Sequence, residues 1–95
     1  MTLIRQFIGE VLRARRAAAG LTLRDVSSRA QVSLGYISEV ERGQKEASSE
    51  LLSSLATALD VPLSELLGDV SDMLKVHEAD LMVNLEHEKV SLPAA

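Results

Sequence analysis

The chain has 95 residues, which suits one small domain, or one domain with an appendage, and is too short for two independent cores. Cysteine is absent, which excludes disulfides, thiol catalysis and cysteine-bound metal centres. Aromatic residues make up only 2% of a sequence that is 46% hydrophobic, so we expect an aliphatic core between helices. No apolar run approaches the roughly eighteen residues of a membrane span, and no signal-peptide pattern is visible. We therefore expect a cytoplasmic protein without a membrane partner.

The net charge of −4 conceals two halves of opposite sign. Residues 1–45 carry eight basic and four acidic side chains, a net charge of +4. Residues 46–95 carry two basic and ten acidic side chains, a net charge of −8. This asymmetry is typical of a protein with one end that faces a polyanion, although two differently solvated surfaces would give the same pattern.

Apolar residues at spacings of three and four predict a first helix that begins near Leu3 and ends at Gly20. A second helix is expected over Leu23–Ala30. Thr22 can cap it, and Asp25 stands three residues later, where a capping box requires an acceptor.

Three further short helices are predicted before residue 68. The third covers Leu34–Arg42 behind a Ser33 cap, and Gly43 closes it. The fourth begins at Ser48 or Ser49. The fifth runs from Pro62 to Leu67 and stops at Gly68.

We divide the chain into a helix-turn-helix domain over residues 1–67 and an acidic extension over residues 68–95. An apolar stripe predicts that the extension is a helix beginning at a Ser71 cap. A strand over residues 80–86 would also fit the local alternation, but the length of the stripe and the lack of internal Gly or Pro favour the helix. Residues 92–95 are expected to be disordered.

The stripe of the extension has no obvious partner in a bundle that is already complete, so we expect it to form a homodimer. Folding back onto its own bundle is the alternative. The predicted dimerisation residues are Val70, Met73, Leu74, His77, Leu81 and Leu85.

The second and third helices, joined by the turn 31–33, form a helix-turn-helix whose second helix can enter the major groove of DNA. On a helical wheel, Ile37 and Val40 face inward. The opposite face carries Gly35, Ser38, Glu39 and Arg42. A glycine allows close approach, short polar side chains can reach base edges, and an arginine can reach a phosphate, although a merely solvated face would look the same.

Two runs, RAAAGLT from Arg16 and SLGYISEVERG from Ser33, resemble the Xre family of Cro-and-repressor type regulators. The family pattern covers about residues 5–67. The stretch Ser33–Glu50 is similar, more narrowly, to actinobacterial activators of Clp protease genes. The resemblance implies an all-α fold, a five-helix repressor-like DNA-binding bundle to which this chain adds a C-terminal helical extension. It also implies a transcription regulator that reads a near-palindromic operator as a dimer.

The resemblance assigns roles residue by residue. Arg16 and Glu41 match a structural ion pair of the family. The residues that match positions where relatives touch bases and backbone are Ser33, Gly35, Tyr36, Ser38, Glu39 and Arg42. Lys45 matches a phosphate contact. Leu23 departs from the glutamine that many relatives place there, which leaves that DNA contact in doubt, and Gln31 departs from the usual turn glycine.

The remaining arginines outside the family motifs have different expected roles. Arg24 lies in the first turn of the second predicted helix, whose N-terminal end usually points at the DNA backbone. We therefore include it among the predicted DNA-binding residues as a phosphate contact, with a solvated charge as the alternative. We interpret Arg13, Arg15 and Arg29 as solvated surface charges.

The expected partners are double-stranded DNA, a second copy of the chain, RNA polymerase, and a Clp-type protease that would act on the C-terminal Ala94 and Ala95. No enzyme, cofactor or metal site is predicted, because His77 and Asp80 alone do not make a metal site and no catalytic constellation is present. Two alternatives stay open. One is an antitoxin that represses its own operon and binds a toxin through residues 68–95. The other is an interaction module that does not read DNA.

Overall fold

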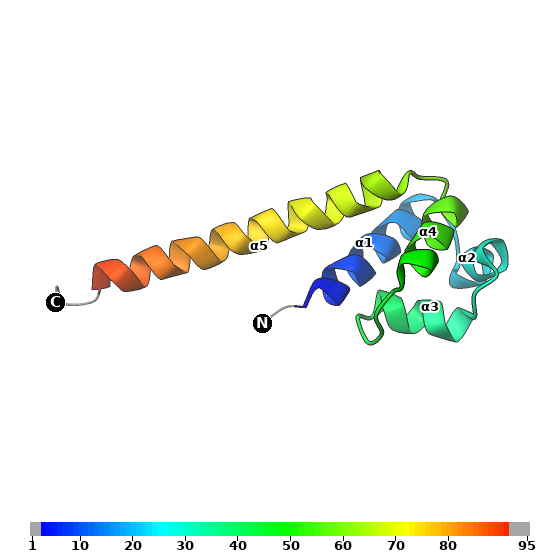
Figure 1. Ribbon diagram of the computed structural model, residues 1–95, viewed down its shortest axis with the longest axis horizontal. Helices are drawn as coiled ribbons and strands as arrows, with labels where there is room; N and C mark the ends of the chain where they lie inside the picture. Colours follow the sequence, from blue (N-terminus) through cyan, green and yellow to red (C-terminus); the bar gives the residue numbers. More distant parts are fainter. Residues whose placement is uncertain (1–2, 92–95) are drawn as a thin grey trace.

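The computed structural model describes the backbone of residues 3–91 and the side chains of residues 3–83. Within that range the chain forms five helices and no strand (Figure 1). The helices are α1 (Ile4–Ala18), α2 (Leu23–Ala30), α3 (Leu34–Glu41), α4 (Ser49–Ala58) and α5 (Leu63–Ser91). The predicted all-α class is confirmed.

The helix starts follow local capping chemistry. At the start of α2, the Asp25 N–H donates to Thr22 Oγ1 at 3.0 Å and the Thr22 N–H donates to Asp25 Oδ2 at 2.9 Å, which is the predicted capping box. The hydroxyl oxygens of Ser33 and Ser48 each accept from the backbone N–H three residues later, at 3.1 Å. The starts of α2, α3 and α4 are therefore fixed by residues that the sequence alone identifies.

The helices enclose one aliphatic core. Helix α1 packs on α3 and α5, α2 packs on α3 and α4, and α4 packs on α5. The buried apolar residues are Phe7, Val11, Leu12, Val26, Ile37, Val40, Leu51, Leu55, Ala56, Ala58, Leu59, Leu66 and Val70. Ile37 and Val40 are each only 1% exposed, so the inward face of α3 is fixed between α1 and α2.

Helix α5 continues through Gly68, so the predicted helix end at Gly68 and new start at Ser71 were wrong. A glycine inside a helix costs about 1 kcal/mol relative to alanine, which local reasoning treats as a stop. Here Leu66 and Val70, on either side of it, are both buried in the core, and each buried aliphatic side chain contributes about 1.5–3 kcal/mol. Tertiary packing therefore outweighs the local preference.

The second half of α5 projects from the bundle. The first half of α5 runs along α1, and the helix then continues beyond the first turn of α1 (Figure 1), which gives the molecule dimensions of 60 × 22 × 22 Å. Residues 80–86 are helical, so the alternative of a strand there is excluded. Residues 92–95, which were expected to be disordered, lie outside the described residues.

Among residues 3–91, no single helix has both the length and the apolar character of a membrane crossing. Helix α4 and the part of α5 up to Val83 meet those criteria only as a pair, with a bend of 107° between them.

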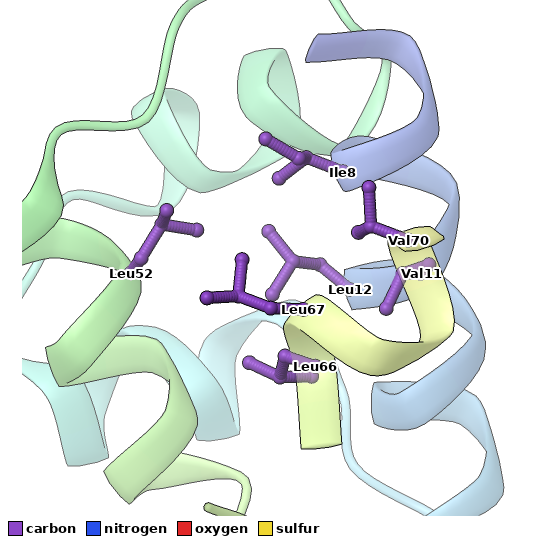
Figure 2. A pocket seen from close by; sticks show the side chains of 7 residues that line it. All are labelled: Ile8, Val11, Leu12, Leu52, Leu66, Leu67 and Val70. Carbon is purple, nitrogen blue, oxygen red and sulfur yellow. The ribbon is translucent and has the colours of Figure 1, made fainter. Parts of the chain in front are cut away.

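A small apolar pocket lies where α1, α4 and α5 meet (Figure 2). All of its lining side chains are aliphatic: Ile8, Val11, Leu12, Leu52, Leu66, Leu67 and Val70. Its volume of about 10 Å³ is no more than one water requires, and a water there would have no polar side chain to bind. We interpret the pocket as a small gap in side-chain packing at the edge of the core, beside Leu67, which is 46% exposed.

Gly9 allows the close approach of α1 to the end of α3. A Cβ atom built on Gly9 would lie 2.5 Å from the carbonyl oxygens of both Val40 and Glu41. These are backbone atoms of another helix, which cannot rotate away as a side chain could. The sequence alone does not reveal this contact, because Gly68 is also a glycine within a helical stripe and no heavy atom lies within 4 Å of a Cβ built on it.

We expect Gly9→Ala to lower the free energy of unfolding by about 1–3 kcal/mol, because the added methyl group forces α1 away from α3. Gly68→Ala is the matched control, since no heavy atom lies within 4 Å of a Cβ built there. It should raise stability by about 0.5–1 kcal/mol through helix propensity. Urea denaturation measures both, and equal stability of the two variants would contradict the close α1–α3 contact.

Candidate nucleic-acid interface

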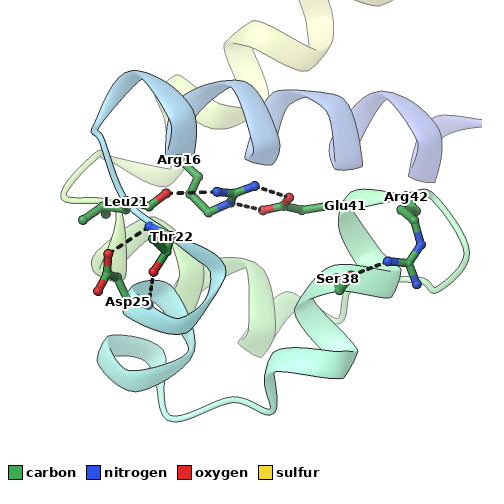
Figure 3. Close-up of polar contacts among 7 residues, drawn as sticks. All are labelled: Arg16, Leu21, Thr22, Asp25, Ser38, Glu41 and Arg42. Carbon is green, nitrogen blue, oxygen red and sulfur yellow. Dashed lines mark hydrogen bonds and ion pairs between the residues drawn. The ribbon is translucent and has the colours of Figure 1, made fainter.

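An ion pair joins the three helices that form the candidate interface. Arg16 of α1 donates to both carboxylate oxygens of Glu41 of α3 (Figure 3). The distances are 2.7 Å from Nε to Oε2 and 3.0 Å from Nη2 to Oε1. Arg16 Nη1 also donates to the Leu21 carbonyl, just before α2, at 2.9 Å. The two side chains are 17% and 7% exposed, and the hydrogen bonds to Glu41 raise the pKa of Arg16. The Arg16 guanidinium therefore has a structural role, because it holds α1, the end of α3 and the segment just before α2 together.

The outward face of α3 is left free by that packing. Gly35 is exposed, and no heavy atom lies within 4 Å of a Cβ built on it. Ser38 and Glu39 are half-buried and Arg42, at the end of the helix, is exposed. Arg42 Nη1 donates to Ser38 Oγ (Figure 3), and Nη2 donates to Gln44 Oε1 at 3.4 Å. Both partners are neutral, and among the described side chains no carboxylate lies within 4 Å of Arg42.

The turn after α3 carries Lys45, which is exposed. Tyr36, a predicted DNA contact, donates from its hydroxyl to the Glu46 carbonyl at 2.7 Å and so holds this turn against α3. Ser33 is the cap of α3, so its hydroxyl oxygen is engaged with the backbone of its own helix.

Arg5 of α1 holds the same turn from the other side, a role that sequence reasoning missed. Its Nε donates to the Gly43 carbonyl at 2.9 Å, and its Nη1 lies 3.2 Å from Glu46 Oε1. Gly43 itself has a φ of 73°, a left-handed conformation that favours glycine. No local pattern could reveal Arg5, because about forty residues separate it from its partners.

At the start of α2, Arg24 is exposed and Leu23 is half-buried against the core. Hydrogen bonds from Thr22 lower the pKa of Asp25, the acidic residue in the first turn of α2. Leu23 therefore contributes packing, and Arg24 is the basic side chain available at this helix end.

The interpretation of Arg15 as a solvated charge was wrong. Its Nε lies 2.7 Å from Asp69 Oδ2 and its Nη2 lies 3.1 Å from Oδ1, while Glu65 lies 3.4 Å from Nη1. Arg29 is exposed but donates from Nη1 to the Ala58 carbonyl, at 3.3 Å. Arg15 thus fastens α5 to α1, and Arg29 satisfies a carbonyl at the end of α4.

The predicted dimerisation residues of α5 fall into three groups. Val70 is buried in the core of its own bundle, which removes it from any exposed face. Met73 and Leu74 are half-buried against that core, and the His77 ring meets Phe7 edge to face with centroids 5.7 Å apart. Leu81 is 52% exposed, and the side chain of Leu85 lies outside the described residues.

A metal site would need three or more ligands that converge. Among the described side chains, no group of three His, Cys, Asp or Glu residues is close enough to hold an ion.

Removal of either partner of the Arg16–Glu41 pair should destabilise the bundle, because the other charge stays in a largely enclosed site. We expect Arg16→Met and Glu41→Leu each to lower the free energy of unfolding by roughly 2–4 kcal/mol. The double variant should lose clearly less than the sum of the two. Strict additivity in urea denaturation would contradict the pairing.

The Arg15–Asp69 pair predicts a pH dependence. The hydrogen bond from Arg15 lowers the pKa of Asp69 below its ordinary value of 3.8, so its stabilising effect is fully present above that pH. The effect is lost as the pH falls through the lower pKa of the folded state. The difference in unfolding free energy between wild type and Asp69→Asn should therefore shrink progressively below about pH 4. A difference that stays constant down to about pH 2 would contradict the pair.

Comparison with known proteins agrees with this geometry. Residues 12–66 match the helix-turn-helix family HTH_3. The transcriptional regulator ClgR of Mycobacterium tuberculosis is 54% identical over 76 residues, which are 80% of this chain and 68% of that protein. The crystal structure of the clp gene regulator ClgR from Corynebacterium glutamicum is 40% identical with a TM-score of 0.76, over 92% of this chain and 95% of that one. The restriction-modification controller protein C.AhdI from Aeromonas hydrophila is 35% identical with a TM-score of 0.64, over 65% and 94%.

These relatives are named as regulators or controllers, and the resemblance drawn from the sequence is confirmed. The chain belongs to the Xre-type helix-turn-helix family of transcriptional regulators, and within that family it is similar to ClgR.

Proposed function

We propose that this regulator reads a near-palindromic operator as a homodimer, through the outward face of α3, and activates genes for Clp proteases and related proteostasis functions. The gene class follows from the relatives, since the protein from C. glutamicum is named as a regulator of clp genes. Activation follows from the similarity of Ser33–Glu50 to activators.

The main support for sequence-specific DNA binding is the free outward face of α3. The helix is held from behind by Ile37, Val40 and the Arg16–Glu41 pair, so its opposite face can enter a groove without disturbing the core. That face offers Gly35 for close approach and Ser38 and Glu39 for base edges. A carboxylate can accept from the amino group of cytosine, which gives Glu39 a role in specificity.

Backbone contacts would come from the charges around this face. Arg42, Lys45 and Arg24 are exposed at the end of α3, in the following turn and at the start of α2. Such contacts fix register and orientation but carry no sequence information.

The projecting part of α5 supports the homodimer. The apolar stripe that contains Met73, Leu74 and His77 continues to Leu81, which is 52% exposed. A second copy is the natural cover for an apolar helix face on an otherwise complete bundle, and two-fold symmetry is the commonest arrangement. Two α3 helices held about 34 Å apart would reach successive major grooves.

Two further partners belong to this proposal. The first is RNA polymerase, which an activator must contact. Ala94 and Ala95 remain a proposed signal for a Clp-type protease, and they lie outside the described residues.

Selection from a random duplex library at about 0.15 M salt tests the proposal as a whole. Two inverted half-sites centred about one helical turn apart are expected. Enrichment of a single half-site would contradict the homodimer but support sequence-specific DNA binding. No enrichment by a folded protein would favour an interaction module instead.

Variants of Glu39 and Arg42 should act differently on the selected duplex. Glu39→Gln should change the preferred base at one position of each half-site, by about 1–3 kcal/mol of discrimination, because it alters a base contact. Arg42→Glu should weaken binding to all duplexes, because it replaces a phosphate contact with repulsion. Affinities for a panel of single-base variants of the site measure both effects, and uniform losses for both proteins would contradict the role of Glu39.

A further inference from the structure

A polar groove of about 290 Å³ lies between α1, α2 and α3. It is lined by Arg13, Arg16, Leu23, Ser38, Glu41 and Arg42. Ser38 and Arg42 belong to the outward face of α3, and Leu23 belongs to the first turn of α2. The groove therefore lies beside the surface that the proposed function places on DNA.

The charges in this polar groove do not cancel. Three guanidinium groups share it with one carboxylate, and the two oxygens of that carboxylate are engaged by Arg16 at 2.7 and 3.0 Å. Arg42 donates to neutral partners. Among the described side chains, no carboxylate lies within 4 Å of Arg13. Two positive charges, on Arg13 and Arg42, are thus left facing one space.

The backbone adds to this potential. Leu23 is the first residue of α2, where the N–H groups have no acceptor within their own helix. The N-terminal end of a helix carries a partial positive charge of about half a unit. The Asp25 carboxylate of the same turn offsets part of this potential, but it is bonded to the Thr22 N–H and does not line the groove. A small anion in the groove would meet this end of α2 together with Arg13 and Arg42.

We infer that the polar groove receives one phosphate of the operator backbone in each half-site, and that Arg13 is a DNA-contacting residue on α1. This inference rests on the proposed function. It changes the interpretation of Arg13 from a solvated charge to a contact, and it gives α1 a direct part in fixing the register of α3 on the duplex.

The experiment compares wild type, Arg13→Gln and Lys75→Gln on the duplex obtained by selection. Gln keeps helix propensity, and Lys75 is exposed on α5, away from the groove, so Lys75→Gln removes the same charge as a matched control. Dissociation constants are measured between about 0.05 and 0.2 M salt, a range over which counterion release dominates. Circular dichroism checks that each variant is folded.

Each lost phosphate contact lowers the slope of log affinity against log salt by about 0.9. Between about 0.05 and 0.2 M salt the affinity of both proteins falls. For each protomer, the fold-loss of wild type should be about 3.5 times that of Arg13→Gln. Lys75→Gln should follow wild type. The preferred base sequence should be unchanged for both variants.

A scan of single methylphosphonate linkages, which remove the charge of one phosphate, locates the contact. At one position in each half-site, a neutral linkage should weaken the binding of wild type. The same linkage should leave the binding of Arg13→Gln unchanged. If Arg13→Gln and Lys75→Gln have the same slope on a duplex that wild type binds specifically, the inference is overturned and the proposed function stands. If wild type binds no duplex specifically, both are overturned.

Discussion

The close contact between α1 and the end of α3 is the constraint on which the rest of the structure depends. An isolated helix of eight residues is not stable in water, so α3 exists as a helix only because it is packed. Ile37 and Val40 supply that packing, and Gly9 lets α1 come close to the final carbonyl groups of α3. The Arg16–Glu41 pair then fixes the rotation of α3 about its own axis.

This arrangement separates two tasks that a short helix must perform together. Its inner face supplies stability, and its outer face makes only local side-chain bonds among the described residues, from Arg42 to Ser38 and Gln44. Arg5 and Tyr36 extend the same logic to the turn after α3, where they hold Glu46 and leave Lys45 exposed. The basic half of the chain is therefore ordered around α3, with its structural charges paired and its remaining charges at the surface.

The Arg15–Asp69 pair connects this half to the acidic half. Because α5 is one continuous helix, its orientation at Asp69 determines where its projecting end lies. If that end joins two copies, the spacing of their α3 helices is set by how α5 is fastened to α1. A single rigid helix thus links the packing of the bundle to the geometry of the proposed operator.

The parts of the fold that depend on local chemistry could be predicted from the sequence. Thr22, Ser33 and Ser48 mark helix starts because a cap and its N–H partner lie within three residues. The end of the fifth helix could not be predicted, since the continuation through Gly68 depends on the burial of Leu66 and Val70 against distant helices.

The same limit applies to the candidate site. The outward face of α3 follows from helical periodicity, but the anchors Arg5 and Asp69 act across 38 to 54 residues and leave no pattern in the chain. The early part of the predicted dimerisation stripe was assigned to a partner because the sequence does not reveal that Val70 belongs to the core.

The central claim is that α3, held from behind by α1, presents its outward face to DNA. Amide chemical shifts of the full chain, recorded as the selected duplex is added, test this most directly. We expect large shifts at Gly35, Ser38 and Glu39, in the turn around Lys45 and in the first turn of α2, with α4 unaffected. Shifts confined to α5, or none at all on α3, would contradict it.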